Sequence, residues 1–336
     1  MSDGVSIETD LLEKQINRGI EAARIVWQAS PGIEAFLNDS SPAFSNAFLD
    51  ELVLGLESTP GIMKEVVRGG AANAENLNVS PFQGLVEVIQ NADDVRATEV
   101  RFAIRTQNSL KQLILVHNGH SLRCNDVLGM TLPFITTKRD EAEQRGRFGI
   151  GLKTLKRIAN TISIHSAPYH FNIVDTTIQR AKSIENIPSF YEASSDTLIC
   201  IDLKENFEEE KLKDWFDAWE DDGLLFLASV SNFKWCDVYG TTISAKKLDF
   251  TEWLDSEFDI QGNNLKSIKY RTAKSHRGLW TIWKTKVVVP NHLNPSHKTR
   301  TEFTEISIAL PDNAMPGSLY IGFKRSEEHT SELQSL

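Results

Sequence analysis

The sequence predicts an α+β fold in which a mixed sheet is covered by helices on one face. Two observations support this prediction. Apolar residues recur at helical spacing early in the chain and again from Phe82 to Asp94, whereas short alternating or β-branched runs dominate from Glu99 onward. The order helix, strand, strand, polar loop, helix and further strands is typical of an α+β layer sandwich.

The composition is that of a globular chain. Its 336 residues are 40% hydrophobic and 24% charged, and this length allows roughly two or three domains. The longest apolar runs, Leu113–Val116 and Leu224–Val230, are far shorter than the roughly 20 residues of a membrane span. Residues Met1–Glu13 lack the basic start and apolar block of a secretory signal, so we expect a cytoplasmic protein with no membrane partner.

The cysteines and the net charge argue against several classes of function. Cys124, Cys200 and Cys236 are odd in number and widely spaced, which favours reduced thiols over a disulfide framework or a zinc cluster. The net charge of −10 does not support non-specific nucleic-acid binding. Part of the negative charge lies in Glu205–Asp222, where a solvated helix face is the simplest interpretation.

The two ends of the chain are expected to lie outside the main domain. Residues 1–80 form a helical N-terminal segment in this interpretation, because Ile7–Phe36 and Ala43–Val67 both carry apolar residues at helical spacing. Arg325–Ser335 matches the translation of a common sequencing adapter. Residues 325–336 are therefore expected to be an artefact tail that replaces further native sequence, with a native polar terminus as the alternative.

Residues 81–222 are expected to form the main domain. Pro81 opens a helix from Phe82 to Asp94, in which Leu85, Ile89 and Ala92 face the core. Further elements follow from the apolar patterns: strands at Glu99–Ile104, Leu113–His117, Thr161–Ser166, Phe171–Val174 and Thr197–Leu203, and a helix at Leu152–Ala159.

Residues 223–324 are expected to form a second, truncated α/β domain. Its predicted strands are Leu224–Trp235, Gly278–Val289 and Thr304–Ala309. The tryptophans from Trp215 onward gather after the main domain, which is more typical of core packing than of a cofactor site.

A glycine-rich loop, Gly146-Arg147-Phe148-Gly149-Ile150-Gly151, precedes the helix predicted at Leu152–Ala159. Glycines let backbone N–H groups approach phosphate oxygens, and the N-terminus of a following helix favours negative charge. The pattern alone is weak, because dinucleotide-binding folds and plain turns also contain it. A Rossmann fold needs a buried strand before the first glycine, whereas Lys138–Arg145 is polar and charged.

The helix from Phe82 to Asp94 supplies groups that suit a magnesium-bound triphosphate. Asn91 offers an amide oxygen for a hard magnesium ion that also takes phosphate oxygens and waters. Glu87, one turn earlier, suits the orientation or deprotonation of an attacking water. Taken separately, Glu87, Asn91 and Asp94 are more often the polar stripe of an amphipathic helix, but their coincidence with the glycine loop favours the functional interpretation.

Four motifs follow one another in the order found in the GHKL ATPases. They are Glu87-x-x-x-Asn91-Ala92-x-Asp94, a strand that ends in a turn at Gly119, Thr136-Thr137-Lys138, and Gly146–Lys153 with the sequence GRFGIGLK. Over about Pro81–Lys204 the chain resembles this family, whose fold is of the Bergerat type, and it is most similar to the sacsin-type relatives of the ninety-kilodalton heat-shock chaperone.

The resemblance implies ATP and magnesium as cofactors and assigns a role to each motif. It implies that Glu87 is the general base, that Asn91 is the magnesium ligand and that Asp94 lies near the nucleotide. It also implies nucleotide contacts for Lys138 on a lid, for Gly146, Phe148, Gly149, Gly151 and Lys153 near phosphate, and for Thr197 near adenine. The polar stretch Thr136–Arg145 suits a mobile lid, although an ordinary solvated loop has the same composition. Residues 223–324 would correspond to a transducer-like or middle-like domain.

The chain departs from the family pattern in the motif that reads adenine. The family has Asp-x-Gly-x-Gly, whose carboxylate accepts a hydrogen bond from the adenine amino group, whereas this chain has His117-Asn118-Gly119-His120-Ser121. A neutral His117 can accept through one ring nitrogen, but a protonated ring can only donate. His117 and Gly119 are therefore candidate nucleotide-binding residues, with a satisfied core histidine as the alternative for His117.

These residues lead us to expect magnesium-dependent ATP binding and slow hydrolysis that drive closure of the lid and rearrangement of the following domain. A nucleotide-binding scaffold with little or no hydrolysis is the alternative. A histidine kinase is disfavoured, because no helical hairpin with a phospho-acceptor histidine is evident before Pro81. The expected partner is a client protein or the missing C-terminal domains. A nucleotide-dependent dimer is a further alternative. Because GHKL folds serve chaperones, topoisomerases and repair clamps, the fold does not identify the client.

Overall fold

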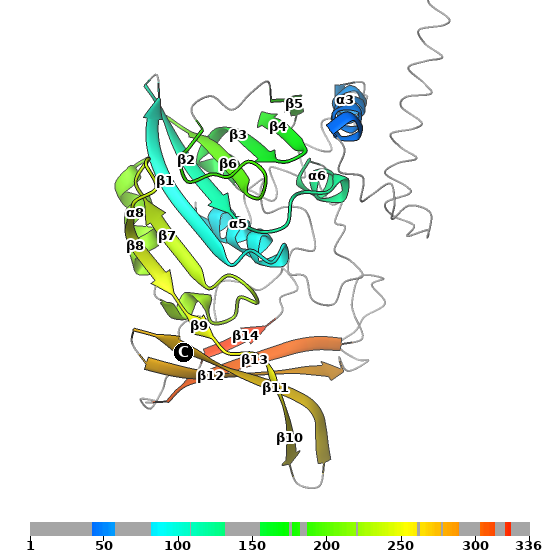
Figure 1. Cartoon of the computed structure of the whole chain (residues 1–336), viewed down its shortest axis with the longest axis vertical. Coiled ribbons are helices and arrows are strands. Elements are labelled where there is room, and N and C mark those ends of the chain that lie inside the picture. The colour runs from blue at the N-terminus through cyan, green and yellow to red at the C-terminus, as the bar shows by residue number, and fades with distance from the viewer. Residues whose placement is uncertain are drawn as a thin grey trace, which may run out of the picture.

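The computed structural model of the chain describes residues 42–57, 82–107, 109–131, 155–174, 177–181, 187–219, 221–260, 263–276, 278–288, 303–312 and 320–323. Figure 1 shows two sheets: the larger one carries the helices, and the smaller one lies below it in this view. The fold is α+β with a large mixed sheet, which confirms the predicted fold class.

The larger sheet has eight strands in the order β5-β4-β3-β6-β2-β1-β7-β8. The pairing of β1 with β7 is parallel and the other pairings are antiparallel, so the sheet is mixed. The strands are β1 (Glu99–Gln107), β2 (Leu110–His117), β3 (Ala159–Ser166), β4 (Tyr169–Val174), β5 (Thr177–Arg180), β6 (Thr197–Leu203), β7 (Asn232–Cys236) and β8 (Thr242–Lys247).

Helix α5 (Gln83–Asp94) packs on one face of this sheet (Figure 1). Its residues Leu85, Ile89 and Ala92 are fully buried, as their spacing predicts. They share one hydrophobic cluster with alternate residues of the strands, for example Leu113 and Leu115 of β2. Because side chains alternate between the two faces of a strand, this cluster marks the face that α5 covers.

Helix α8 (Glu209–Ala218) closes the same core with an aromatic cluster. The ring centre of Phe216 lies 4.6 Å from that of Phe233, and the ring centre of Phe233 lies 4.7 Å from that of Phe102. Trp215 and Trp219 pack at the edge of this cluster. This arrangement confirms that these tryptophans are packing residues, and the acidic side chains of α8 face solvent around the buried Leu212 and Phe216.

Helix α3 (Pro42–Glu57) docks beside β4 and β5. Arg180 of β5 donates hydrogen bonds to the carboxylate of Asp50 and to the side chain of Asn46. The Ser45 hydroxyl donates to the carbonyl of Pro168. This part of the N-terminal segment is helical as expected, and the rest of residues 1–80 before α5 lies outside the described residues.

The smaller sheet has the order β10-β11-β12-β13-β14, with β9 paired to β11. Its buried residues Ala273, Trp280, Ile282 and Ala309 belong to the same hydrophobic cluster as α5, so the two sheets share one core. The strands are β9 (Asp249–Phe250), β10 (Leu254–Ile260), β11 (Asn263–Ser275), β12 (Gly278–Val288), β13 (Phe303–Pro311) and β14 (Tyr320–Phe323).

Two predicted elements are wrong in detail. The stretch Leu224–Trp235 is not one strand: the 3-10 helix η2 (Asp221–Leu224) ends at its first residue, a loop with buried Leu225, Leu227 and Val230 follows, and only β7 is extended. Of the helix predicted at Leu152–Ala159, the described residues form one 3-10 turn, η1 (Leu155–Arg157), before β3 begins. The expected boundary after residue 222 falls before β7 and β8, which the larger sheet contains.

Cys124, at the start of α6 (Cys124–Thr131), is buried and unbridged, as are Cys200 and Cys236, which confirms the expected reduced thiols. No helix among the described segments combines the length and the apolar character needed to cross a bilayer. The tail 325–336 lies outside the described residues.

Candidate functional site

Three buried polar side chains form a row across adjacent strands on the face that α5 covers. His117 of β2 pairs with Thr197 of β6, and Thr197 pairs with Ser166 of β3. His117 is 6% exposed, Thr197 1% and Ser166 0%. Because His117 follows Leu113 and Leu115 at even spacing, its side chain points to the same face as theirs. We call His117, Thr197 and Ser166 the polar row.

Hydrogen bonds fix the two hydroxyl groups of the polar row. The Ser166 hydroxyl oxygen accepts a hydrogen bond from the backbone N–H of Leu122, 3.0 Å away. The same oxygen lies 2.7 Å from the hydroxyl oxygen of Thr197. Ser166 was not predicted as a site residue, and Thr197, which was, is held in place through it.

His117 is neutral and has one ring nitrogen engaged. Burial lowers its pKa to about 4, because the surrounding core does not solvate a charged ring. The backbone N–H of Gly119 donates a hydrogen bond to its Nδ1 over 3.3 Å. The expected end-of-strand position is confirmed, and the ring faces the α5 side of the sheet as part of the polar row.

The turn after β2 is fastened to the end of α5. The backbone N–H of His120 donates to the carbonyl of Val95, at the C-terminal cap of α5, over 2.8 Å. The Asn118 side chain accepts from the backbone N–H groups of Thr98 and Glu99. The structure therefore brings the His117 end of the polar row next to the end of α5 that carries Asn91 and Asp94.

Gly119 is required by this close approach. A Cβ at residue 119 would lie 2.6 Å from Cγ2 and 2.9 Å from the carbonyl oxygen of Val95. Gly119→Ala is expected to lower the free energy of unfolding by about 1–3 kcal/mol, measured by urea unfolding, because backbone must move to relieve the clash. Gly55→Ala in α3 is the matched control, since nothing lies within 4 Å of its added Cβ and alanine favours a helix. Equal stability of the two variants would contradict this account of Gly119.

The three candidate residues of α5 share one partly exposed stripe. Glu87, Asn91 and Asp94 are each half-buried, beside the fully buried core stripe of the helix. All three carry oxygen donors, the ligand type that magnesium prefers. Among the described residues no group of three or more His, Cys, Asp or Glu side chains is placed to hold a metal ion, so a metal here would need phosphate oxygens and waters as well.

Sequence reasoning missed Asp93, which lies between these residues. Its side chain is 3% exposed, and its Oδ1 accepts from the backbone N–H groups of Ser229 (2.7 Å) and Val230 (2.9 Å). Its Oδ2 accepts from the N–H of Ala228 over 2.8 Å. Asp93 therefore holds the loop that leads into β7.

Arg271 of the smaller sheet holds the same loop from the other side. Its guanidinium donates to the carbonyls of Leu227 (2.7 Å) and Ala228 (3.3 Å). The same group lies 3.6 Å from the ring centre of Phe250 and 4.6 Å from that of Trp253. The loop 227–230, in which Leu227 and Val230 are buried, thus connects the helix of the candidate site to the smaller sheet.

The phosphate side of the predicted site lies outside the described residues. This applies to Lys138, Gly146, Phe148, Gly149, Gly151 and Lys153. η1, which follows that segment, contacts α5. Leu155 of η1 and Val127 of α6 are fully buried in the core cluster that contains Leu85 and Ile89.

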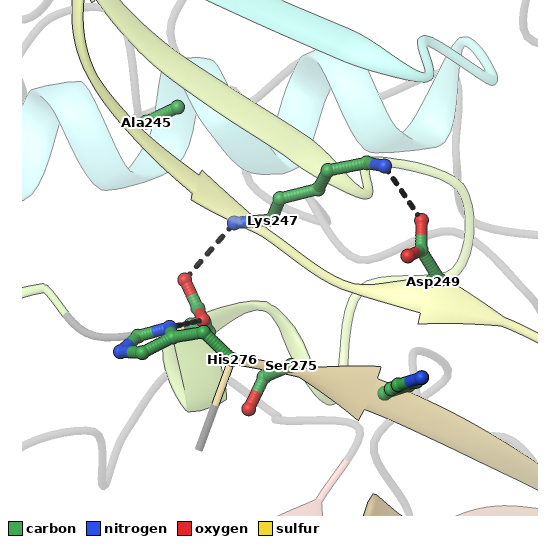
Figure 2. Close-up of a pocket in the computed structure, with 7 residues that line it drawn as sticks. Ala245, Lys247, Asp249, Ser275 and His276 are labelled. Atoms are coloured by element: carbon green, nitrogen blue, oxygen red, sulfur yellow. Dashed lines mark hydrogen bonds and ion pairs between the residues drawn. The ribbon is translucent and has the colours of Figure 1, made fainter. Parts of the chain in front are cut away.

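A separate groove of about 450 Å³ lies at the edge shared by the two sheets. Asp221 joins the sheets there, accepting from the backbone N–H of Lys247 and pairing with Nδ1 of His276. Figure 2 shows Lys247 and His276 on neighbouring elements at this groove. The groove is lined by Asp221, Ala245, Lys247, Asp249, Lys274, Ser275 and His276. None of the predicted site residues lines it.

Comparisons with known proteins give a distant likeness only. No protein-family model matches the chain, and no curated protein matches its sequence. Among solved structures, the ATP-binding domain of topoisomerase IV from Francisella tularensis, in complex with a small-molecule inhibitor, is similar at 12% sequence identity and a TM-score of 0.29. This similarity covers 48% of the chain and 84% of the other protein. We therefore base the proposed function on the residues of the chain itself.

Proposed function

We propose that the chain binds a magnesium-purine nucleoside triphosphate between α5 and the polar row and hydrolyses it slowly. ATP is the triphosphate used by the family that its motifs resemble. One observation carries this proposal: the polar row lies on the face that α5 covers, and the turn at Gly119 contacts the end of α5. A base held by the polar row would lie beside the end of the helix that carries Asn91.

The residues of α5 suit the triphosphate and its metal in this proposal. The Asn91 amide oxygen would hold magnesium, a hard cation that keeps several waters and takes phosphate oxygens as its other ligands. The bound ion would neutralise phosphate charge. Asp94 would contact the nucleotide or its waters, and Glu87 would orient the attacking water and accept its proton.

The remaining roles belong to the loop and the lid. Backbone N–H groups of Gly146–Gly151 would donate hydrogen bonds to phosphate oxygens, with Lys153 adding positive charge near them. Lys138 would close over the nucleotide as part of the lid. Rearrangement on nucleotide binding would reach the smaller sheet through loop 227–230, which Asp93 and Arg271 both hold.

A nucleotide-binding scaffold without significant turnover is the second candidate. His117 favours it, because this chain places an imidazole where the family it resembles uses a carboxylate to read the base. If the chain is such a scaffold, nucleotide binding alone would change the structure through α5, and Glu87 would not be needed for binding.

Asn91→Ala tests the binding site directly. We expect it to weaken magnesium-dependent nucleotide binding by about 10- to 100-fold, because a polar contact to a charged group contributes about 1.5–3 kcal/mol. Calorimetric titration of ATP and inosine triphosphate, with magnesium and with a chelator, measures this loss. Alanine favours a helix, so the unfolding temperature is expected to stay near that of the wild type.

Gln90→Ala is the matched control for Asn91→Ala. Gln90 is the preceding residue of α5, is also half-buried and belongs to no predicted motif. Its replacement is expected to leave the nucleotide affinity within about 3-fold of the wild type. Equal affinity of wild type and Asn91→Ala, with and without magnesium, would contradict the proposed metal role.

A further inference from the structure

The hydrogen bond from Gly119 fixes the tautomer of His117. Because the Gly119 N–H donates to Nδ1, that nitrogen must present its lone pair and carry no proton. The ring is neutral near pH 7, since burial lowers its pKa to about 4. Its single proton therefore lies on Nε2, which is a hydrogen-bond donor. Among the described residues, none accepts a hydrogen bond from Nε2.

The hydroxyl groups of the polar row indicate that Thr197, like Nε2 of His117, is a hydrogen-bond donor. The Ser166 oxygen accepts from the Leu122 N–H, and the acceptor within reach of its own proton among the described residues is the Thr197 hydroxyl oxygen. Ser166 is fully buried, so its proton would otherwise remain unsatisfied. With Ser166 as the donor, the Thr197 hydroxyl keeps its own proton for a group outside the sheet.

The polar row thus presents two neighbouring donors. His117 and Thr197 are directly paired across β2 and β6, which places their Cβ atoms roughly 5 Å apart. A ligand edge that meets both of them needs acceptors, such as carbonyl oxygens or unprotonated ring nitrogens. An exocyclic amino group would instead place two donors against each other.

We propose that His117 makes this site prefer purine triphosphates with a 6-oxo group, as in hypoxanthine and guanine, over ATP. This inference rests on the proposed function, because it concerns the base end of the same site. The 6-oxo oxygen accepts from Nε2, whereas the 6-amino group of adenine places a donor against Nε2 and leaves this buried N–H unpaired. The preference is thus the reverse of the one that a carboxylate at residue 117 would give.

Three nucleotides that differ only in the purine ring near position 6 test this inference. Inosine triphosphate carries the oxo group, ATP the amino group and purine riboside triphosphate neither. We expect the full chain to bind inosine triphosphate at least about 10-fold more tightly than ATP, because one buried hydrogen bond is gained and one donor clash is removed. Purine riboside triphosphate should lie between them. Competition against a fluorescent triphosphate, with magnesium present, measures all three.

His117→Asp should reverse the order, since a carboxylate accepts from the amino group of adenine and repels the oxo group. His117→Asn should bring the affinities for inosine triphosphate and ATP within about 3-fold of each other, because an amide can donate or accept. This variant provides the test if the buried carboxylate of His117→Asp prevents folding. His120→Asp is the matched control. His120 is exposed in the same turn, so this variant should keep the wild-type order.

The measurements distinguish failure of the base preference from failure of the proposed nucleotide binding. Tighter binding of ATP than of both other nucleotides by the wild type would overturn the inference and leave the proposed function intact. An unchanged order in both His117 variants would also overturn it. Absence of binding by all three nucleotides would overturn the proposed function and the inference with it.

Discussion

Asp93→Ala is expected to lower the free energy of unfolding by about 3–5 kcal/mol, the largest stability effect of a single side chain in the site. The backbone N–H groups of Ala228, Ser229 and Val230 would all lose their acceptor. Val230 is fully buried and Asp93 is 3% exposed, whereas Ala228 is exposed, so water can replace the carboxylate at Ala228 but has little access to the N–H of Val230. Urea unfolding followed by circular dichroism measures the change.

Two further variants sharpen this prediction. Asp93→Asn keeps one acceptor oxygen, so it should lose about half as much stability as the alanine variant. Asp214→Ala on α8 is the matched control, because its side chain is exposed and its removal should change stability by less than about 0.5 kcal/mol. Wild-type stability of Asp93→Ala would show that the loop does not depend on this carboxylate.

The sequence places Asp93 at a core position of α5, but no local pattern identifies its role. It falls four residues after Ile89 and eight after Leu85, on the apolar stripe of the helix. A carboxylate at a core position needs several donors, since burying an unpaired charge is costly. The motif contains Asp94 and not Asp93, and the donors to Asp93 lie far along the chain, at Ala228 to Val230, where no local pattern indicates them.

The fold was predictable where local periodicity decides the structure. α5 and β6 formed as predicted because each has a regular apolar pattern and a buried face. The predicted strand Leu224–Trp235 is wrong over Leu224–Val230, because an apolar run shows burial but not the backbone conformation. Here the burial belongs to a loop whose N–H groups bond to Asp93 and whose carbonyls bond to Arg271, not to neighbouring strands.

Single residues of the candidate site were predictable from the sequence, but their pairing across strands was not. His117 and Thr197 were identified singly, through their motifs, but Ser166 was missed because the register between β3 and β6 cannot be read from the sequence. The tautomer of His117 depends on a backbone N–H two residues away and on burial. Both are properties of the folded turn at Gly119, so the sequence left open whether the ring donates or accepts.

Glu87→Ala is expected to slow single-turnover hydrolysis by about 100- to 10,000-fold, the range that a general base supplies. The half-buried Glu87 lies one turn before Asn91 on the same stripe of α5, which suits a carboxylate that handles the attacking water rather than the metal. Nucleotide affinity should therefore stay within about 3-fold of the wild type. Rapid-quench measurement with excess protein separates the chemical step from binding.

Glu87→Gln and Gln90→Ala distinguish proton transfer from a general disturbance of the helix. Glutamine keeps the size and polarity of residue 87 but cannot accept the proton of the water, so it should be nearly as slow as alanine. Gln90→Ala should retain the wild-type rate. Hydrolysis by Glu87→Ala at the wild-type rate would remove the general base from the proposal. Tight binding with only background turnover in the wild type would instead favour the scaffold, since a site complementary to bound nucleotide alone gives no acceleration.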